Sequence, residues 1–268
     1  MSKTTTMPNI RKMFIPDCGY TVFDVDLAGA DAQVVAYEAE DLDLIEAFKK
    51  GLDVHSKNAE DMWGTKFTQL AGTKDNGPKS KKRKECKQGV HATNYGGGPR
   101  TLAKVLGWTV REAEDFQRRW FTLHPGIKKN FHQRVESSLR SSRMVTNRFG
   151  NRRVYFDRID SCFTEALAWI PQSTVAEVSF RGGLQLLKRT GSVYGPRGNL
   201  LSFGWVEMLL QVHDSLVFQV RNSNEHRLEE IRSHLRYPIP YETPHELTIQ
   251  WGIARSRVSW GDCEEVRV

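Results

Sequence analysis

The sequence lacks several features that would define other classes of protein. Its 268 residues include four cysteines, which are scattered without the paired spacing of a zinc site or a disulfide framework. No apolar run approaches the roughly 20 residues that cross a bilayer, and the N-terminus shows no signal-peptide pattern. An internal repeat is also missing. We therefore expect a soluble cytoplasmic protein in a reducing compartment, with no membrane partner.

Positive charge is in moderate excess. Lysine and arginine total 39 against 32 acidic residues, for a formal net charge of +7. This excess is compatible with a polyanionic partner, although charge alone does not identify one. The length suffices to bury a real core, in one large domain or two small ones.

Two apolar, β-rich segments each contain an aspartate. They are residues 22–27 (VFDVDL) and residues 209–218 (LLQVHDSLVF). Burying a lone carboxylate would cost several kcal/mol, and the second segment predicts two strands joined by a turn at His213 and Asp214. Carboxylates brought together from distant strands suit divalent cations, and two such ions suit phosphoryl transfer. Either aspartate alone could instead cap a strand or face solvent.

The remaining pattern predicts strands near both ends of the chain and helices between them. Residues 1–19 are expected to form an irregular lead-in, and Gly195–Pro196 a loop. The expected helices cover 30–50, a basic stretch from about Lys81, 110–121 with a Thr109–Glu112 capping box, 127–139, 166–188 and 224–235. The expected strands cover residues 20–26 and 247–251, a hairpin within 143–156, and two strands on either side of residues 213–214. This order favours an antiparallel sheet interrupted by a helical insertion.

Three segments together resemble one family. Residues 26–36 (DLAGADAQVVA) are similar to motif A of family A DNA polymerases, the bacterial DNA polymerase I group, where the motif reads Asp-Tyr-Ser-Gln-Ile-Glu-Leu-Arg. Residues 83–96 resemble motif B and residues 211–220 resemble motif C, in the family's order. The resemblance runs from about Asn9 to Trp260. Leu27, Gln33 and Ser215 depart from the usual residues, which suggests a divergent, phage-type member that would act in the host cytoplasm.

The resemblance implies an α+β fold, with an antiparallel-sheet palm and an inserted helical fingers subdomain. Residues 1–45 would form the first part of the palm, 46–160 the fingers, and 161–268 the second part of the palm. The implied activity is template-directed DNA synthesis, in which deoxynucleotides are added to a primer 3′-hydroxyl.

The resemblance also implies the metal ligands. Asp26 and Asp214 would be the catalytic carboxylates, and the backbone carbonyl of Leu27 a third ligand. Two Mg²⁺ ions would bind there, with Mn²⁺ as a possible substitute. Asp24 faces the same side of its strand as Asp26. It is either an accessory carboxylate or, as we favour, a solvent-facing side chain. Ser215 replaces a glutamate that usually follows the second aspartate.

A basic row is expected to hold the nucleotide. Arg83, Lys87 and His91 are spaced four residues apart, so they share one face of a helix. The resemblance assigns Arg83 and Lys87 to the triphosphate, His91 to an aromatic position beside the sugar, and His55 to the outgoing phosphates. Asp31 occupies the position of a glutamate that closes the sugar pocket. Taken without the resemblance, the lysine-rich run would be a solvated face or a localisation tag.

Further positions are assigned to DNA by the resemblance. Tyr95 would stack near the template base, Gln172 would read the minor groove of the new duplex, and His213 would touch the primer terminus. The turn around Gly150 carries arginines that either contact phosphate or lie on an ordinary exposed turn: Arg148, Arg152 and Arg153.

The expected partners are primer–template DNA and deoxynucleoside triphosphates. Family members carry a thumb and often a 3′–5′ exonuclease domain before motif A, whereas 25 residues precede Asp26 here. We therefore expect thumb and exonuclease domains to be absent and a second polypeptide to supply their functions. The alternatives are a nucleic-acid-binding subunit without catalysis and an RNA polymerase of the same palm type. Retention of Asp26, Asp214, Arg83 and Lys87 favours the DNA-synthesising enzyme.

Overall fold

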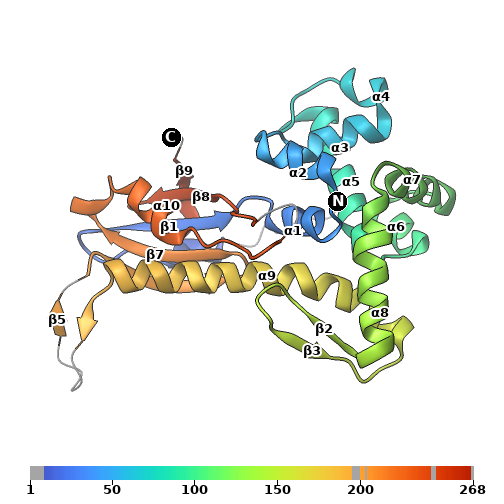
Figure 1. Ribbon diagram of the computed structural model, residues 1–268. Coiled ribbons are helices and arrows are strands. Elements are labelled where there is room, and N and C mark those ends of the chain that lie inside the picture. Colours follow the sequence, from blue (N-terminus) through green and yellow to red (C-terminus); the bar gives the residue numbers. More distant parts are fainter. Residues whose placement is uncertain (1–8, 195–199, 203, 243–245, 267–268) are drawn as a thin grey trace. The chain divides into compact units, whose positions relative to one another are not determined.

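A computed structural model of the chain describes residues 9–194, 200–202, 204–242 and 246–266 (Figure 1). Contacts divide the chain into two compact units. Unit 1 comprises residues 1–30, 175–239 and 248–268, and unit 2 comprises residues 31–174 and 240–247. Unit 1 is built on an antiparallel sheet and unit 2 mainly on helices, so the expected α+β class is confirmed. Within the described ranges, no helix is both long and apolar enough to cross a membrane.

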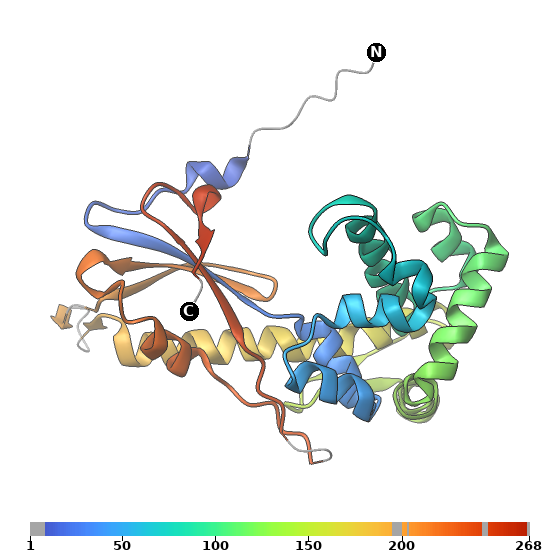
Figure 2. The ribbon, with the colours of Figure 1, turned by 90° about the horizontal axis from the view of Figure 1, so that it is seen from above.

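Unit 1 contains a five-stranded sheet with β1 at its centre (Figure 2). Its neighbours pair antiparallel with it, and the strand order is β6-β7-β1-β8-β9. The strands are β1 (Tyr20–Leu27), β6 (Val206–Val212), β7 (Ser215–Arg221), β8 (Trp251–Ser256) and β9 (Glu264–Glu265). A separate pair is formed by β4 (Val193–Tyr194) and β5 (Leu200–Ser202). The central place of β1 means that its side chains have neighbours on both sides.

One face of this sheet is covered by helices. Phe23, Val25 and Leu27 alternate along β1 and are at most 1% exposed, as expected for one face of a strand. The second half of α9 (Ile159–Thr190) lies against it, because a Cβ at Gly183 would be 3.2 Å from Leu216 Cδ1. Helix α10 (Leu228–Leu235) packs on α9 more closely still, because a Cβ at Gly182 would be 2.5 Å from the Leu235 carbonyl oxygen. This face is the core of unit 1.

The opposite face is covered only in part. Val22 packs there with Val217 and Trp260, and Trp260 begins the short helix η4 (Trp260–Asp262). The other short helices of unit 1 are η1 (Ile10–Met13) and η3 (Asn222–Asn224). Because side chains alternate along a strand, Asp24 and Asp26 lie on this more open face.

Among the residues that the structure describes, unit 2 is mainly helical and contains a β-hairpin. Its core includes Trp120, Ile127, Phe131 and Leu139, all fully buried. Its helices are α1 (Ala30–Glu38), α2 (Leu42–Lys49), α3 (Val54–Trp63), α4 (Thr65–Thr68), α5 (Gly77–Asn94), α6 (Pro99–Leu106), α7 (Val110–Leu123), the π-helix η2 (Ile127–His132), α8 (Gln133–Ser142) and the first half of α9. The hairpin consists of β2 (Met144–Thr146) and β3 (Arg152–Val154), beside α8 (Figure 1).

The single helix predicted over residues 30–50 is wrong, because the chain forms α1 and α2 with a break between them. Glu40 adopts a left-handed backbone with a φ of 53°. The Asp41 carboxylate then accepts a hydrogen bond from the Leu44 N–H at 3.0 Å and caps α2. The apolar spacing predicted the buried face of both helices, but it gave no indication of the capping residue at which the second helix begins.

Other boundaries also differ from prediction, and the helix expected over 127–139 is the π-helix η2 followed by α8, which ends at Ser142. The basic helix begins at Gly77 rather than Lys81, since Pro78 is compatible with a first helical turn. The closing strand is β8 at residues 251–256 rather than 247–251, because pairing with β1 begins at Trp251. The last helix begins at Leu228, after η3, rather than at 224. The loop predicted at Gly195–Pro196 lies outside the described residues.

Several local predictions are confirmed. Thr109 and Glu112 form the expected capping box at the start of α7. The hairpin within 143–156 is present as β2 and β3. The long helix expected over 166–188 is present as α9, which begins earlier, at Ile159, and continues through Pro171.

Candidate active site

Asp26 and Asp214 are brought together in unit 1 by strand pairing. Strands β6 and β7 are joined by a two-residue turn, as predicted, with Val212 opposite Ser215. Ser215 in turn lies opposite Asp26 on β1, and the Leu27 N–H donates to the Asp214 carbonyl at 3.3 Å. Two aspartates from distant parts of the sequence therefore meet at one end of the sheet.

The charges around Asp26 oppose its ionisation. Partial burial raises the pKa of its carboxyl, and the negative charges of Asp214, Asp24 and Glu265 raise it further. The Asp26 side chain nevertheless remains exposed to solvent. Closely spaced carboxylates that repel each other are stabilised by a cation, and an all-oxygen donor set suits Mg²⁺. The residues present therefore fit the metal that the sequence predicts.

The prediction that Asp24 faces solvent is wrong. Its carboxylate accepts hydrogen bonds from Trp260 Nε1 at 2.7 Å and from Ser215 Oγ at 3.2 Å. Its side chain is 20% exposed. The contact with Trp260 spans most of the chain, so strand alternation predicted the correct face but not the cover over it. Asp24 on β1 therefore places a carboxylate beside Ser215, the residue that replaces the family's usual glutamate.

Gly252 leaves room for the Asp26 carboxylate. It lies opposite Asp26 on β8, and a Cβ built there would be 2.9 Å from Asp26 Oδ1. Real Cβ atoms essentially never approach another heavy atom so closely, so any larger residue would push the carboxylate aside. Sequence reasoning missed this glycine, because it belongs to none of the three motifs.

The basic row lies on α5 in unit 2. Arg83, Lys87 and His91 follow one another along this continuous helix. The Arg83 guanidinium grips Asp53 with two hydrogen bonds, Nε to Oδ2 at 2.7 Å and Nη2 to Oδ1 at 2.5 Å. Burial alone would raise the pKa of Asp53, but hydrogen bonds from Arg83 and Ser56 outweigh it and lower the pKa to about 2. Asp53, to which the resemblance assigned no role, thus holds the guanidinium in place.

His55 is held neutral beside this row. Burial and the positive charges of Lys87 and Arg83 lower the pKa of its imidazole to about 4. Its Nδ1 atom is buried without a hydrogen-bond partner. A phosphate oxygen nearby would offset the surrounding positive charge and could accept a hydrogen bond from the ring. The position assigned to His55 is therefore chemically consistent with an anionic ligand.

Asp31, His91 and Tyr95 form a second group in unit 2. The Tyr95 hydroxyl donates to Asp31 Oδ2 at 3.1 Å, and His91 Nε2 lies 3.9 Å from the same oxygen. The His91 and Tyr95 rings are 4.4 Å apart, edge to face. Tyr95 is 9% exposed, so its stacking near a template base stays a prediction.

The remaining residues assigned to DNA lie apart along the sequence. His213 is exposed at the β6–β7 turn and has a left-handed backbone, with a φ of 56°. Gln172 is exposed on α9, and Arg152 is exposed on β3. Arg153 forms an ion pair with Glu165 and lies over the Tyr155 ring. Their contacts with DNA stay predictions.

A cluster in unit 2 has the composition of a metal site. Asp41, Asp43 and His124 each offer a ligand atom within 4.8 Å of the others. However, the Lys57 ammonium lies 2.5 Å from Asp43, and His124 Nδ1 is 2.8 Å from Asp41 Oδ2. Burial would raise the pKa of Asp41, yet the hydrogen bond and charge of His124 lower it. The charges of the cluster are therefore paired with one another, although His124 Nε2 is buried without a hydrogen-bond partner.

The sequence profile of DNA polymerase family A matches residues 2–256. This match covers nearly the whole chain and includes both aspartates and the basic row. The chain therefore belongs to DNA polymerase family A.

Similar proteins agree with this assignment. A DNA polymerase I from Helicobacter pylori is 28% identical over 252 residues, which cover 90% of this chain and 26% of that protein. The DNA polymerase I of Geobacillus stearothermophilus is 28% identical over 228 residues, covering 82% of this chain and 24% of that protein. This chain thus spans about a quarter of the length of the curated relatives it matches.

A solved structure shares the fold. It is described as the POL domain of Pol1 from M. smegmatis in complex with DNA primer-template and dNTP. Its TM-score is 0.75 at 22% identity, and the match covers 94% of this chain and 42% of that chain. The similarity shows that the two chains share a fold.

Proposed function

We propose that this chain is the core of a template-directed DNA polymerase, which adds deoxynucleotides to a primer 3′-hydroxyl. The observation that carries the proposal is the meeting of Asp26 and Asp214 at one end of the β1–β7 pair. Family membership supports it. In this proposal residues 1–45 and 161–268 form the palm and residues 46–160 form the fingers.

The palm residues would hold the metal. Asp26, Asp214 and the Leu27 carbonyl would bind two Mg²⁺ ions, or Mn²⁺ in their place. When bound, these ions supply Lewis-acid chemistry that activates the primer hydroxyl and neutralises the leaving pyrophosphate. Gly252 keeps the Asp26 carboxylate free to reach them, and His213 would touch the primer terminus.

The residues of α5 would hold the nucleotide. Arg83 and Lys87 would bind the triphosphate through charge-assisted hydrogen bonds, with His55 beside the outgoing phosphates. Asp53 accepts hydrogen bonds from Nε and Nη2 of Arg83, which leaves the other N–H groups of the guanidinium for the triphosphate. Asp31 and His91 would contact the sugar. The DNA would be contacted by Tyr95, Gln172, Arg152 and Arg153.

The direct test is extension of a labelled primer–template by the purified chain with deoxynucleoside triphosphates. We expect extension that depends on Mg²⁺, stops on chelation and favours deoxy- over ribonucleotides. A preference for ribonucleotides would favour the RNA polymerase alternative. If the chain alone is inactive and a second polypeptide restores synthesis, synthesis requires that partner. DNA binding without synthesis under every condition would favour a non-catalytic subunit.

Asp31→Glu should strengthen the exclusion of ribonucleotides. Asp31 is one methylene shorter than the family's glutamate, so we expect a looser fit against a 2′-hydroxyl. Restoring the methylene should raise discrimination by about tenfold, or roughly 1.4 kcal/mol. The measurement is the ratio of kcat/KM values for a deoxy- and a ribonucleotide. An unchanged or smaller ratio in the variant would contradict the prediction.

Gly252→Ala should impair synthesis without unfolding the chain. The new Cβ would displace the Asp26 carboxylate, and we expect kcat to fall by about tenfold or more because small misplacements of a catalytic group are costly. The apparent affinity for Mg²⁺ should fall with it. A matched control is Gly98→Ala, where a Cβ meets nothing within 4 Å. Equal effects of the two substitutions would argue against a role for Gly252 in placing Asp26.

A further inference from the structure

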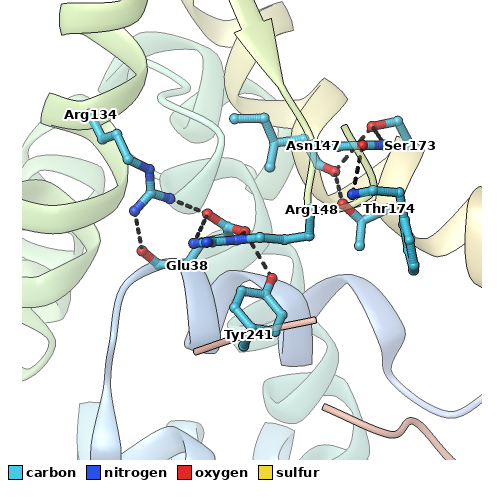
Figure 3. Close-up of polar contacts among 9 residues, drawn as sticks. Glu38, Arg134, Asn147, Arg148, Ser173, Thr174 and Tyr241 are labelled. Carbon is cyan, nitrogen blue, oxygen red and sulfur yellow. Dashed lines mark hydrogen bonds and ion pairs between the residues drawn. The ribbon is translucent and has the colours of Figure 1, made fainter. Parts of the chain in front are cut away.

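A pocket of about 270 Å³ lies in unit 2, and its lining includes Arg148, which was expected above either to contact phosphate or to lie on an exposed turn. One wall is charged and contains Glu38, Arg134 and Arg148, while Val135 and Val145 contribute apolar surface. Figure 3 shows the Glu38 carboxylate between the two guanidinium groups. None of the three motifs predicted this arrangement.

Positive charge exceeds negative charge at this wall. The Glu38 side chain is 3% exposed and pairs with both Arg134 and Arg148. It also accepts a hydrogen bond from the Tyr241 hydroxyl at 2.8 Å. Burial, together with the charge of Glu38, raises the pKa of Tyr241 well above its usual value, so the phenol stays neutral. Two guanidinium groups face one carboxylate, which leaves one positive charge uncompensated within this group.

The arginines remain accessible and retain hydrogen-bond donors. Their side chains are 40% exposed for Arg134 and 35% exposed for Arg148. A guanidinium has five N–H donors, and the contacts with Glu38 use two from each arginine. Both residues can therefore offer further N–H groups to an anion in the pocket, with the geometry that suits phosphate.

The turn that carries Arg148 is held in shape by Asn147. The Asn147 side-chain oxygen accepts hydrogen bonds from the backbone N–H groups of Phe149 and Asn151, both at 3.0 Å. Its amide nitrogen donates to Ser173 Oγ at 3.1 Å (Figure 3). The Arg148 guanidinium also lies 4.5 Å from the centre of the Tyr241 ring. Fixed in this way, Arg148 would lose little conformational entropy when a ligand binds.

We propose that this pocket binds a phosphate group of a nucleic-acid strand. The arginines would contact the phosphate through N–H groups that Glu38 does not use. The choice of a strand as the source of the phosphate rests on the proposed polymerase function. A purely structural ion pair would need only one arginine to neutralise Glu38. Here a second arginine is present, and the pair borders an open pocket.

Ser138 provides a test that leaves the contacts of Glu38 intact. It lines the pocket from α8, and Ser138→Asp would place a carboxylate beside the arginines. Ser137→Asp is the matched control, because it makes the same charge change at an exposed neighbouring position outside the pocket lining. Circular dichroism and thermal melting of both variants establish that each is folded.

Binding is measured by fluorescence anisotropy with a fluorescein-labelled single-stranded 20-mer, in EDTA and without nucleotides, over a range of salt concentrations. We expect Ser138→Asp to weaken binding by about tenfold and to reduce the salt-dependence slope by about one, as for the loss of one phosphate contact. Ser137→Asp should change the affinity less than about twofold. Equal losses in both variants, or no binding by the unsubstituted chain, would overturn the proposal.

A competition arm distinguishes the sources of the phosphate. If inorganic phosphate or dAMP at millimolar concentration binds the unsubstituted chain and not Ser138→Asp, while 20-mer binding is the same in both, the site belongs to a free phosphate compound and the strand proposal fails. Because this assay contains no metal and no dNTP, its result is independent of whether the chain polymerises. Failure of the pocket proposal can thus be told from failure of the proposed function.

Discussion

Replacing Asp214 by asparagine should reduce Mg²⁺-dependent primer extension by about a thousandfold or more. The substitution keeps the size of the side chain and leaves the backbone contact with Leu27 available, but it removes one of the two negative charges that would hold the metal. Removing that charge also relieves the repulsion that raises the pKa of Asp26. The fold should therefore be as stable as before, or slightly more so, while activity is lost.

The measurement is the single-turnover rate of adding one nucleotide to a labelled primer, with thermal melting of the same preparations. Asp262→Asn is a suitable control, because Asp262 lies in η4 and pairs with Lys12 at 2.6 Å rather than with Asp26 or Asp214. We expect it to retain most of the activity. Extension by Asp214→Asn at more than a tenth of the unsubstituted rate would place the catalytic metal elsewhere.

Replacing Arg83 by alanine should raise the KM for deoxynucleoside triphosphates by about thirtyfold, equivalent to roughly 2 kcal/mol of binding to the triphosphate. The guanidinium is already oriented by Asp53, so the unsubstituted chain loses little entropy in presenting it to a ligand. Asp53 retains Ser56 as a partner at 2.6 Å, which limits the loss of stability in the variant.

The control for this prediction is Lys84→Ala, one residue further along α5. Lys84 is exposed and, at one position from Arg83, points to another side of the helix. The variant changes the net charge by the same amount, so it measures the effect of charge alone. If both variants raised KM equally, the basic helix would act through its overall charge, and Arg83 would have no specific role.

Local patterns in the sequence were informative wherever neighbouring residues decide the structure. The alternation around Asp26 predicted β1, and the His213–Asp214 turn predicted the hairpin that carries the second aspartate. The Thr109–Glu112 capping box is formed as expected, because all its atoms lie within one helical turn. At Asp41 two local patterns conflict. The apolar periodicity predicts one continuous helix, whereas the capping side chain of Asp41 begins a second helix.

Contacts between distant residues were beyond the reach of such patterns. Trp260 covers Asp24 across 236 positions, and Gly252 makes room for Asp26 only because β8 pairs with β1. Asp53 orients Arg83 from the position just before α3, 30 positions away. The residues next to each of these in the sequence do not indicate which distant residue it contacts.

The sequence by itself determined the family, the α+β class and the residue types that could bind a metal and a triphosphate. These follow from short motifs, whose chemistry depends on residue identity and spacing. Only the tertiary structure decided that Asp24 is covered, that Asp53 holds Arg83, and that Glu38 is buried between Arg134 and Arg148. The physical reason is that burial and pairing are set by strand register and helix packing, which join residues through space at any separation along the chain.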